Sequence, residues 1–186
     1  MVGAGVAPGL ETVVVAGGCF WCTEAVFSEL RGVRSVLPGY TGGTVANPSY
    51  EQVCTGRTGH AEAVQVTFDP SEHSLHDLLV VFFTTHDPTT RDRQGPDVGA
   101  QYRSAVFYRT PGQKDVAEAV VREVERERLY PRPVVTEIVP LTTFYPAEEY
   151  HRAYYRRNPE RGYCQAVIAP KLAKFRKAHA ARLAPA

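Results

Sequence analysis

The feature that most constrains the fold is an apolar, β-branched run that stops at two glycines and leads directly into a helical pattern. Residues 12–16 predict a short buried strand. Gly17 and Gly18 break this strand, and the apolar spacing that follows predicts a helix over residues 20–30. A strand, a glycine turn and a helix in direct succession place Cys19 at the N-terminus of that helix.

Strand and helix patterns alternate along the rest of the chain without the strict regularity of βαβ units. Further strands are predicted over residues 33–40, 62–68, 105–108 and 134–139. Further helices are predicted over residues 50–53, from Ser74 to a stop at Asp87-Pro88, and over 113–129, 147–155 and 171–181, with loops over 89–102 and 158–164. This order predicts an α+β fold, a two-layer domain over residues 11–186 with helices on a mainly antiparallel or mixed sheet. Residues 1–10, rich in Gly, Ala and Pro, are predicted to be a mobile tail.

Charge and hydropathy exclude several classes of function. A formal net charge of +1 over 186 residues gives no strong field that would attract nucleic acid. No apolar run reaches the roughly 18 residues that a membrane span needs. The N-terminus lacks the basic start of a signal peptide, so we expect a cytoplasmic protein. Four cysteines are too few for a secreted disulfide scaffold and suit catalytic, metal-binding or simply buried thiols.

Cys19 has the surroundings of a nucleophile. The thiolate is the reactive form of cysteine, and the ordinary pKa of a free thiol is about 8.5. The unpaired N–H groups and partial positive charge of a helix N-terminus favour the anion, so we expect this helix to lower the pKa of Cys19. Phe20 and Trp21, the one tryptophan of the chain, follow directly and predict apolar walls for a methyl or thioether group.

Cys19 and Cys22 have a redox spacing, because residues three apart at a helix start lie about 5–6 Å apart at Cα, within reach of a disulfide. This spacing fits a nucleophile with a partner thiol, a thioredoxin-like oxidoreductase or half of a zinc site. A structural zinc site needs a second ligand pair, but Cys54 and Cys164 are isolated and His60 lies six residues after Cys54. We therefore predict no metal site and a structural role for Cys54.

A series of short motifs extends over nearly the whole chain. In order, these motifs are Gly18-Cys19-Phe20-Trp21, Gly39-Tyr40-Thr41-Gly42-Gly43, Asn47-Pro48-Ser49-Tyr50, Thr58-Gly59-His60-Ala61-Glu62, His86-Asp87-Pro88, Gln94-Gly95-Pro96-Asp97, Gly99-Ala100-Gln101-Tyr102-Arg103-Ser104, Asn158-Pro159 and Gly162-Tyr163-Cys164. The series resembles the peptide methionine sulfoxide reductases that act on the S epimer of the sulfoxide. This resemblance implies a ferredoxin-like α/β plait and the reduction of methionine sulfoxide, free or in proteins, to methionine.

The resemblance also implies roles for two central residues. Cys19 is implied to be the nucleophile, and Glu62 the acid that protonates the sulfoxide oxygen. Cys19 is then implied to pass through a sulfenic acid to a disulfide that thioredoxin reduces, with no cofactor. Sulfoxide sulfur is a weak electrophile until its oxygen takes a proton, and a carboxyl that stays protonated near neutral pH needs burial. Glu62 lies in a predicted strand rich in Val and Ala, which suits such burial.

We expect the protein to be a monomer.

Five further residues are implied to bind the substrate. Tyr50 and Tyr102 match hydroxyl donors to the sulfoxide oxygen, in the manner of an oxyanion site. Asp97 matches a residue that orders the site and its water. Phe20 and Trp21 match the walls around the substrate methyl group.

The sequence leaves the resolving thiol open. Cys164 matches a family resolving cysteine and is predicted on a glycine-flanked loop, mobile enough to approach Cys19. Cys22 is nearer to Cys19 but lies one helix turn in. We favour Cys164, with Cys22 as the alternative and a relay between the two as a third course. The competing functions are a general disulfide oxidoreductase and a non-enzymatic redox-sensing module.

Overall fold

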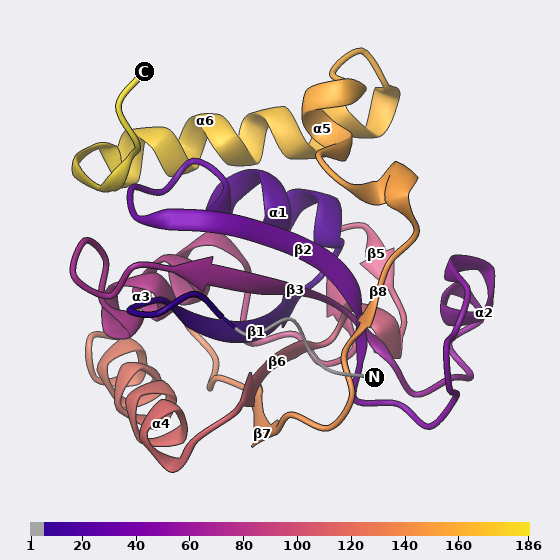
Figure 1. Cartoon of the computed structure of the whole chain (residues 1–186), viewed down its shortest axis with the longest axis horizontal. Coiled ribbons are helices and arrows are strands. Elements are labelled where there is room, and N and C mark those ends of the chain that lie inside the picture. Colours follow the sequence, from indigo (N-terminus) through magenta and orange to yellow (C-terminus); the bar gives the residue numbers. More distant parts are fainter. Residues whose placement is uncertain (1–5) are drawn as a thin grey trace.

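A six-stranded sheet forms the centre of residues 6–186, the part of the chain that the computed structural model describes (Figure 1). Its strands are β1 (Glu11–Gly17), β2 (Val33–Thr41), β3 (Ala61–Phe68), β6 (Ser104–Tyr108), β7 (Glu137–Pro140) and β8 (Tyr145–Pro146), and a separate hairpin comprises β4 (Arg93–Gln94) and β5 (Asp97–Val98). The sheet order is β7-β6-β1-β3-β2-β8, antiparallel at every contact except the parallel one between β6 and β7. The predicted mainly antiparallel, mixed sheet is confirmed.

The helices complete an α+β fold, as predicted. They are α1 (Phe20–Phe27), α2 (Tyr50–Cys54), α3 (Leu75–Thr85), α4 (Pro111–Arg126), α5 (Tyr154–Arg157) and α6 (Ala169–Ala178). Figure 1 shows α6 lying along α1, and α4 along α3. Most elements lie where the sequence predicts them, with ends that differ by a few residues.

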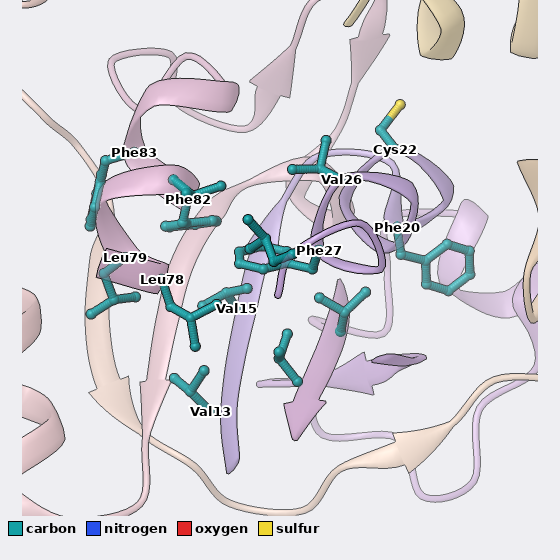
Figure 2. Packing of buried hydrophobic residues seen from close by; sticks show 14 of the residues in the cluster. Val13, Val15, Phe20, Cys22, Val26, Phe27, Leu78, Leu79, Phe82 and Phe83 are labelled. Atoms are coloured by element: carbon teal, nitrogen blue, oxygen red, sulfur yellow. The ribbon is translucent and has the colours of Figure 1, made fainter. Parts of the chain in front are cut away.

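The alternation of side chains along β1 divides the core into two sides. Val15 faces the helices, where Phe27 of α1 and Phe82 of α3 are buried against it (Figure 2). Burial of one such aromatic side chain stabilises the fold by about 1.5–3 kcal/mol. Most of the buried aromatic side chains lie on the helical side, so this side supplies most of the apolar stabilisation. The opposite side holds small residues such as Ala63 and is covered by the coil at residues 141–144.

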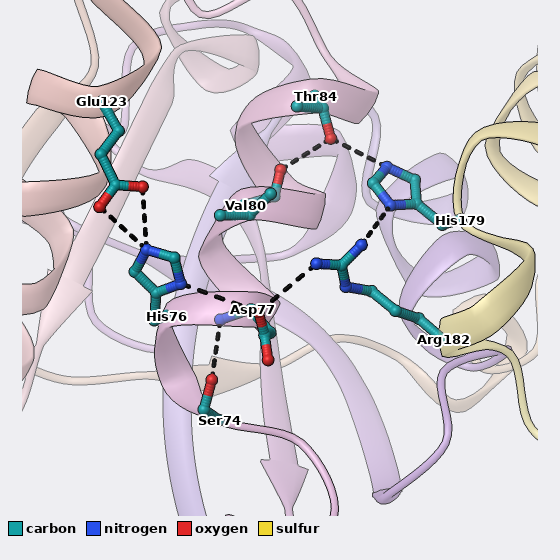
Figure 3. Close-up of polar contacts among 8 residues, drawn as sticks. All are labelled: Ser74, His76, Asp77, Val80, Thr84, Glu123, His179 and Arg182. Atoms are coloured by element: carbon teal, nitrogen blue, oxygen red, sulfur yellow. Dashed lines mark hydrogen bonds and ion pairs between the residues drawn. The ribbon is translucent and has the colours of Figure 1, made fainter.

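Polar side chains connect α3 to its two helical neighbours (Figure 3). His76 Nε2 lies 2.9 Å from a carboxylate oxygen of Glu123 on α4. Asp77 lies 3.4 Å from the guanidinium of Arg182, which follows α6. Such partly exposed pairs contribute only about 0–1 kcal/mol each, so they orient the helices more than they stabilise them.

The predicted helix over residues 20–30 ends earlier than expected, at Phe27. Leu30 pairs instead with Leu183 in an isolated antiparallel bridge, and the neighbouring backbone groups bond to the same C-terminal segment. These long-range backbone hydrogen bonds replace the ones that would extend the helix.

Two other predictions are wrong. Residues 89–102 are not a structureless loop, because they contain the β4–β5 hairpin and a 3₁₀ turn at Ala100–Tyr102. The predicted helix over residues 147–155 is interrupted at Ala153, whose φ of 50° is left-handed. This residue separates a second 3₁₀ turn from α5.

The predicted strand over residues 134–139 begins only at Glu137, because the preceding backbone is bonded elsewhere: the Val135 N–H donates to the Pro88 carbonyl at 2.8 Å. The predicted tail falls partly outside the described residues, and its residues 6–10 form a turn before β1. No helix within residues 6–186 combines the length and apolar character needed to cross a bilayer.

His86 at the end of α3 predicts a pH dependence of stability. Nδ1 donates to the Phe82 carbonyl at 2.5 Å, Nε2 lies 2.8 Å from Ser104 Oγ, and burial lowers the pKa of His86 to about 4. Because this value lies below the ordinary 6.5, the stabilisation is complete above pH 6.5 and is lost as the pH falls toward 4. In urea unfolding, we expect His86→Gln to remove about 2 kcal/mol of the decline over this range.

The exposed His76 supplies the control for this experiment. His76→Gln is expected to retain the wild-type decline in the free energy of unfolding. An unchanged decline in His86→Gln would show that His86 does not carry the effect.

Candidate active site

Glu62 lies on β3 with its side chain on the helical side of the sheet. It shares that side with Val64, and Tyr40 is its cross-strand neighbour on β2. Because α1 starts just beyond the end of β1, its first backbone N–H meets the carboxyl: Phe20 N donates to Glu62 Oε2 at 3.0 Å. The N-cap residue Cys19 makes no side-chain cap bond, so Glu62 satisfies this otherwise unpaired donor.

Burial favours the neutral form of the Glu62 carboxyl. The residue is 1% exposed, and burial raises its pKa to about 8. The bond from Phe20 opposes this rise, whereas the negative charges of Asp97 and Cys22 add to it. Since Oε2 accepts from the backbone, Oε1 is the oxygen left to carry the proton. The predicted burial of Glu62 is confirmed.

Cys19 is also buried, and this reverses the expected effect of the helix on its thiol. The residue is 8% exposed, and burial raises the pKa of Cys19 well above its ordinary value, with further increases from Cys22 and Glu62. A helix N-terminus offers only a fraction of a positive charge, which the loss of water around a buried sulfur outweighs. The prediction that the helix lowers the pKa of Cys19 is wrong.

Cys22, one turn into α1, has the low pKa of the thiol pair. A hydrogen bond from Cys19 lowers the pKa of Cys22 to about 7, against the opposing effect of burial. The positive charge of Lys171 and the Tyr163 hydroxyl, 3.8 Å from Cys22 Sγ, lower it further. Just above neutral pH, the two thiols therefore hold one proton between them.

Phe20 and Trp21 belong to an aromatic cluster at the N-terminal end of α1. Cys19 and Cys22 lie at the same end of the helix. Phe20 stacks on Tyr50, with ring centroids 6.3 Å apart and planes at 19°. Trp21 stacks on Tyr154, with centroids 3.8 Å apart and planes at 7°. The indole N–H of Trp21 donates to His151 Nδ1 at 3.0 Å. The cluster gives the start of α1 the apolar surroundings that the sequence predicts.

The hydroxyls of Tyr50 and Tyr102 both lie within electrostatic range of Glu62. Burial first, and then the Glu62 carboxyl, raise the pKa of each tyrosine, so both hydroxyls remain protonated donors. Glu148, which lies outside the motifs, holds the backbone of Tyr50. Its carboxylate accepts from the Tyr50 backbone N–H at 3.1 Å and from the Tyr40 hydroxyl at 3.0 Å.

Asp97, on β5, joins the site through a tyrosine hydroxyl. Its Oδ2 accepts from Tyr163 Oη at 2.6 Å, and the same hydroxyl faces Cys22. Because its negative charge also raises the pKa of Glu62, Asp97 lies near both the thiol pair and the carboxyl.

Cys164 is not on a mobile loop. It begins a π-helical turn, Cys164–Ile168, that continues into α6, and the residue is fully buried. Its approach to another thiol therefore requires this turn to move; such turns are often found at functional sites. Burial and then the charge of Cys22 raise the pKa of Cys164, so Cys22 lies within electrostatic range of it. Cys54, predicted to be structural, lies exposed at the end of α2.

Sequence reasoning missed the residues that support the site from a distance. They are Glu24, Glu148, His151, Tyr154 and Tyr163. Only Tyr163 falls in a motif, and no spacing in the sequence could reveal the others, because each acts on a residue far away in the chain.

Within residues 6–186, no group of three or more His, Cys, Asp or Glu residues is placed to hold a metal ion. A cleft of about 300 Å³ lies between the end of α3 and α6 rather than over Cys19. Lys171 lines both this cleft and a small void beside Cys22.

The chain matches one protein family over nearly its whole length. The profile of the family described as Peptide methionine sulfoxide reductase matches residues 11–183. The chain belongs to this family. It is therefore an oxidoreductase, and the resemblance carried by the sequence motifs is confirmed.

Individual relatives agree with this assignment. Peptide methionine sulfoxide reductase MsrA of Thermus thermophilus is 61% identical over 175 residues, which cover 94% of this chain and 98% of the relative. The structure of methionine sulfoxide reductase A of Corynebacterium diphtheriae, 37% identical, has a TM-score of 0.75 and covers 86% of this chain and 79% of its own. The structure of reduced Mxr1 of Saccharomyces cerevisiae, 32% identical, has a TM-score of 0.78 and covers 86% of this chain and 92% of the Mxr1 chain. A structure of Mxr1 in complex with Trx2, 22% identical with a TM-score of 0.55, shows likeness of fold alone.

The thiol pair of this reductase predicts one thiolate with a midpoint near pH 7. We expect the ultraviolet thiolate absorbance of the reduced protein to rise by one equivalent around that pH. Cys22→Ser should move the first midpoint upward, because Cys19 is then the remaining buried thiol of the pair. Cys54→Ser, which changes an exposed thiol, is the control and should leave the midpoint in place. A midpoint near pH 7 that persists in Cys22→Ser would assign the low pKa to another thiol.

Proposed function

We propose that this chain reduces the S epimer of methionine sulfoxide, free or in proteins, to methionine, and so repairs oxidised proteins. The observation that carries the proposal is a buried carboxyl, Glu62, hydrogen-bonded to the first backbone N–H of the helix that starts beside Cys19. A carboxyl with a pKa of about 8 is a proton donor at neutral pH, which is what a sulfoxide oxygen needs before its sulfur can be attacked.

In the proposed first step, Cys19 passes its proton to the Cys22 thiolate beside it and attacks the sulfoxide sulfur, while Glu62 gives its own proton to the sulfoxide oxygen. The S–S bond formed by this attack then breaks as the hydroxyl moves from the substrate sulfur to Cys19 Sγ. The substrate sulfur gains two electrons and leaves as methionine, and Cys19 is left oxidised as a sulfenic acid. Tyr50 and Tyr102 donate hydrogen bonds to the oxygen as it gains negative charge. Asp97 orders the site through Tyr163, and the aromatic cluster holds the methyl group.

For the return to the thiol, we propose a relay through both candidate thiols. Cys22 attacks the sulfenic acid of Cys19, which releases water and forms the Cys19–Cys22 disulfide. Cys164 then attacks Cys22, which frees Cys19 as a thiol and leaves a Cys22–Cys164 disulfide. The pKa of about 7 at Cys22 supports this order, as does the electrostatic effect of Cys22 on Cys164.

Thioredoxin is the proposed reductant of the final disulfide, by exchange through a mixed disulfide. The resemblance of the motifs implies this partner, and Mxr1 has been solved in complex with Trx2. Motion of the turn at Cys164–Ile168 would present the disulfide to the partner.

We also propose a more specific description of the fold. We propose that residues 11–186 act as one catalytic domain with a ferredoxin-like core. The succession β1-α1-β2-β3-α3-β6 and the sheet order β6-β1-β3-β2 support this label. We also propose a monomer, and a cytoplasmic location because the cycle starts from free thiols.

The acid role of Glu62 predicts a specific pH dependence. The single-turnover rate with a methionine S-sulfoxide should fall as the pH rises through about 8, where Glu62 loses its proton. Glu62→Gln keeps a neutral acceptor for the Phe20 N–H but has no proton to transfer, so the rate should drop roughly 10²–10⁴-fold and lose that decline. Stopped mixing with quantified methionine measures both effects.

Insulin-disulfide reduction provides the control for Glu62→Gln, because thiol–disulfide exchange needs no acid for an oxygen. A general disulfide oxidoreductase would reduce insulin well and sulfoxide poorly. An unchanged sulfoxide rate in Glu62→Gln would remove the acid role, and normal turnover by Cys19→Ser would remove the mechanism.

The relay predicts different fates for two serine variants after one equivalent of substrate. Cys22→Ser should accumulate a sulfenic acid at Cys19, because the neighbouring thiol that condenses with it is gone. Cys164→Ser should stop at the Cys19–Cys22 disulfide, reducible by dithiothreitol but only slowly by thioredoxin. Peptide mapping by mass spectrometry distinguishes these species, with Cys54→Ser as the control that behaves as wild type.

A Cys19–Cys164 disulfide in the wild-type protein would contradict the proposed order. Normal thioredoxin-dependent turnover by Cys164→Ser would exclude Cys164 from the relay.

A further inference from the structure

Trp21 is held by two contacts that come from a part of the chain without a motif. Its ring lies flat on Tyr154, with planes at 7° and centroids 3.8 Å apart. Its indole N–H donates to His151 Nδ1 at 3.0 Å. The stack fixes the plane of the indole, and the hydrogen bond fixes its rotation within that plane.

His151 can accept this hydrogen bond in only one protonation state. A ring nitrogen that accepts must be unprotonated, so the proton of a neutral His151 is on Nε2. The imidazolium carries protons on both nitrogens and cannot accept from an indole. His151 is fully buried, and its ring packs 5.0 Å from that of Phe20 and 4.5 Å from that of Tyr50. The ring therefore has little freedom to take another orientation.

The backbone that carries His151 is fixed by the same helix that carries Trp21. The chain turns at Ala153, whose φ of 50° is unfavourable for a residue other than glycine. The Ala153 N–H donates to Glu24 Oε1 at 2.8 Å, and Glu24 lies on α1, in the turn after Trp21. This contact holds the interrupted segment against α1, with His151 on one side of the turn and Tyr154 on the other.

We propose that His151 is a positioning residue that orients Trp21 as a wall of the methyl-binding pocket, and that only its neutral form does so. The identity of the bound methyl group rests on the proposed function. The orientation of the indole by the imidazole does not, because it is a property of the protein without substrate.

The proposal predicts that acid releases Trp21. The groups that face His151 are the rings of Phe20, Trp21, Tyr50 and Tyr150, and the carboxylates of Glu51 and Glu148. Burial lowers the pKa of His151 below its ordinary value, and the two carboxylates oppose this shift. The hydrogen bond to Trp21 is thus present at neutral pH and is lost as the pH falls below the ordinary range of histidine.

A matched pair of variants separates the hydrogen bond from the packing. Asn and Leu have nearly the same shape, but only Asn offers an acceptor near the position of Nδ1. We expect His151→Leu to raise the KM for the sulfoxide about two- to tenfold, the effect of one hydrogen bond, while the rate at saturation changes little. His151→Asn should keep a KM near that of the wild type. Equal increases in both variants would assign His151 a packing role and overturn the proposal.

Intrinsic fluorescence gives a second test, because Trp21 is the only tryptophan in the chain. An imidazolium quenches indole emission more strongly than a neutral imidazole, so the wild-type emission should titrate at acid pH. His151→Asn should abolish this titration, and His76→Asn, which changes an exposed histidine facing α4, should retain it. A titration that persists in His151→Asn would contradict the proposal.

The fluorescence experiment needs neither sulfoxide nor turnover, so it remains informative if His151→Leu fails to fold. It also separates the two hypotheses. If His151→Asn loses the titration and the wild-type protein reduces no sulfoxide, the proposed function is refuted and the positioning role remains.

Discussion

The hydrogen bond from the Phe20 N–H to Glu62 is the contact on which the rest of the site depends. A buried carboxyl that is ionised usually needs a charged partner or several hydrogen-bond donors. Glu62 has one backbone donor, and with a pKa of about 8 it remains neutral at neutral pH. The same bond caps the helix that carries both thiols. One interaction therefore sets the distance between acid and nucleophile and stabilises the element that bears the nucleophile.

The fold brings these groups together through simple geometry. Alternation along β3 turns Glu62 toward the helices, and the glycine turn after β1 starts α1 directly above it. The irregular segment before α5 then supports the site from outside, with Glu148 on Tyr50 and His151 on Trp21. Its interruption at the left-handed Ala153 lets His151 and Tyr154, which lie on either side of this residue, both contact Trp21.

Local pattern was enough to predict the strand, glycine turn and helix around Cys19, the burial of Glu62 and the aromatic neighbours of the thiols. It failed where distant contacts decide. The pKa of Cys19 depends on burial by residues that are distant in the sequence. Cys164 has the local sequence of a loop residue, and only the structure shows that it is buried at the start of a π-helical turn. His151 carries no signal at all, because its partner lies 130 residues away.

The protonation state of Glu62 tests this account most directly, and infrared spectroscopy of the reduced protein measures it. We predict a carboxylic acid carbonyl band at neutral pH that disappears with a midpoint near 8 and is missing from Glu62→Gln. A carboxyl that is already ionised at neutral pH, with a midpoint near the ordinary 4.5, would contradict it.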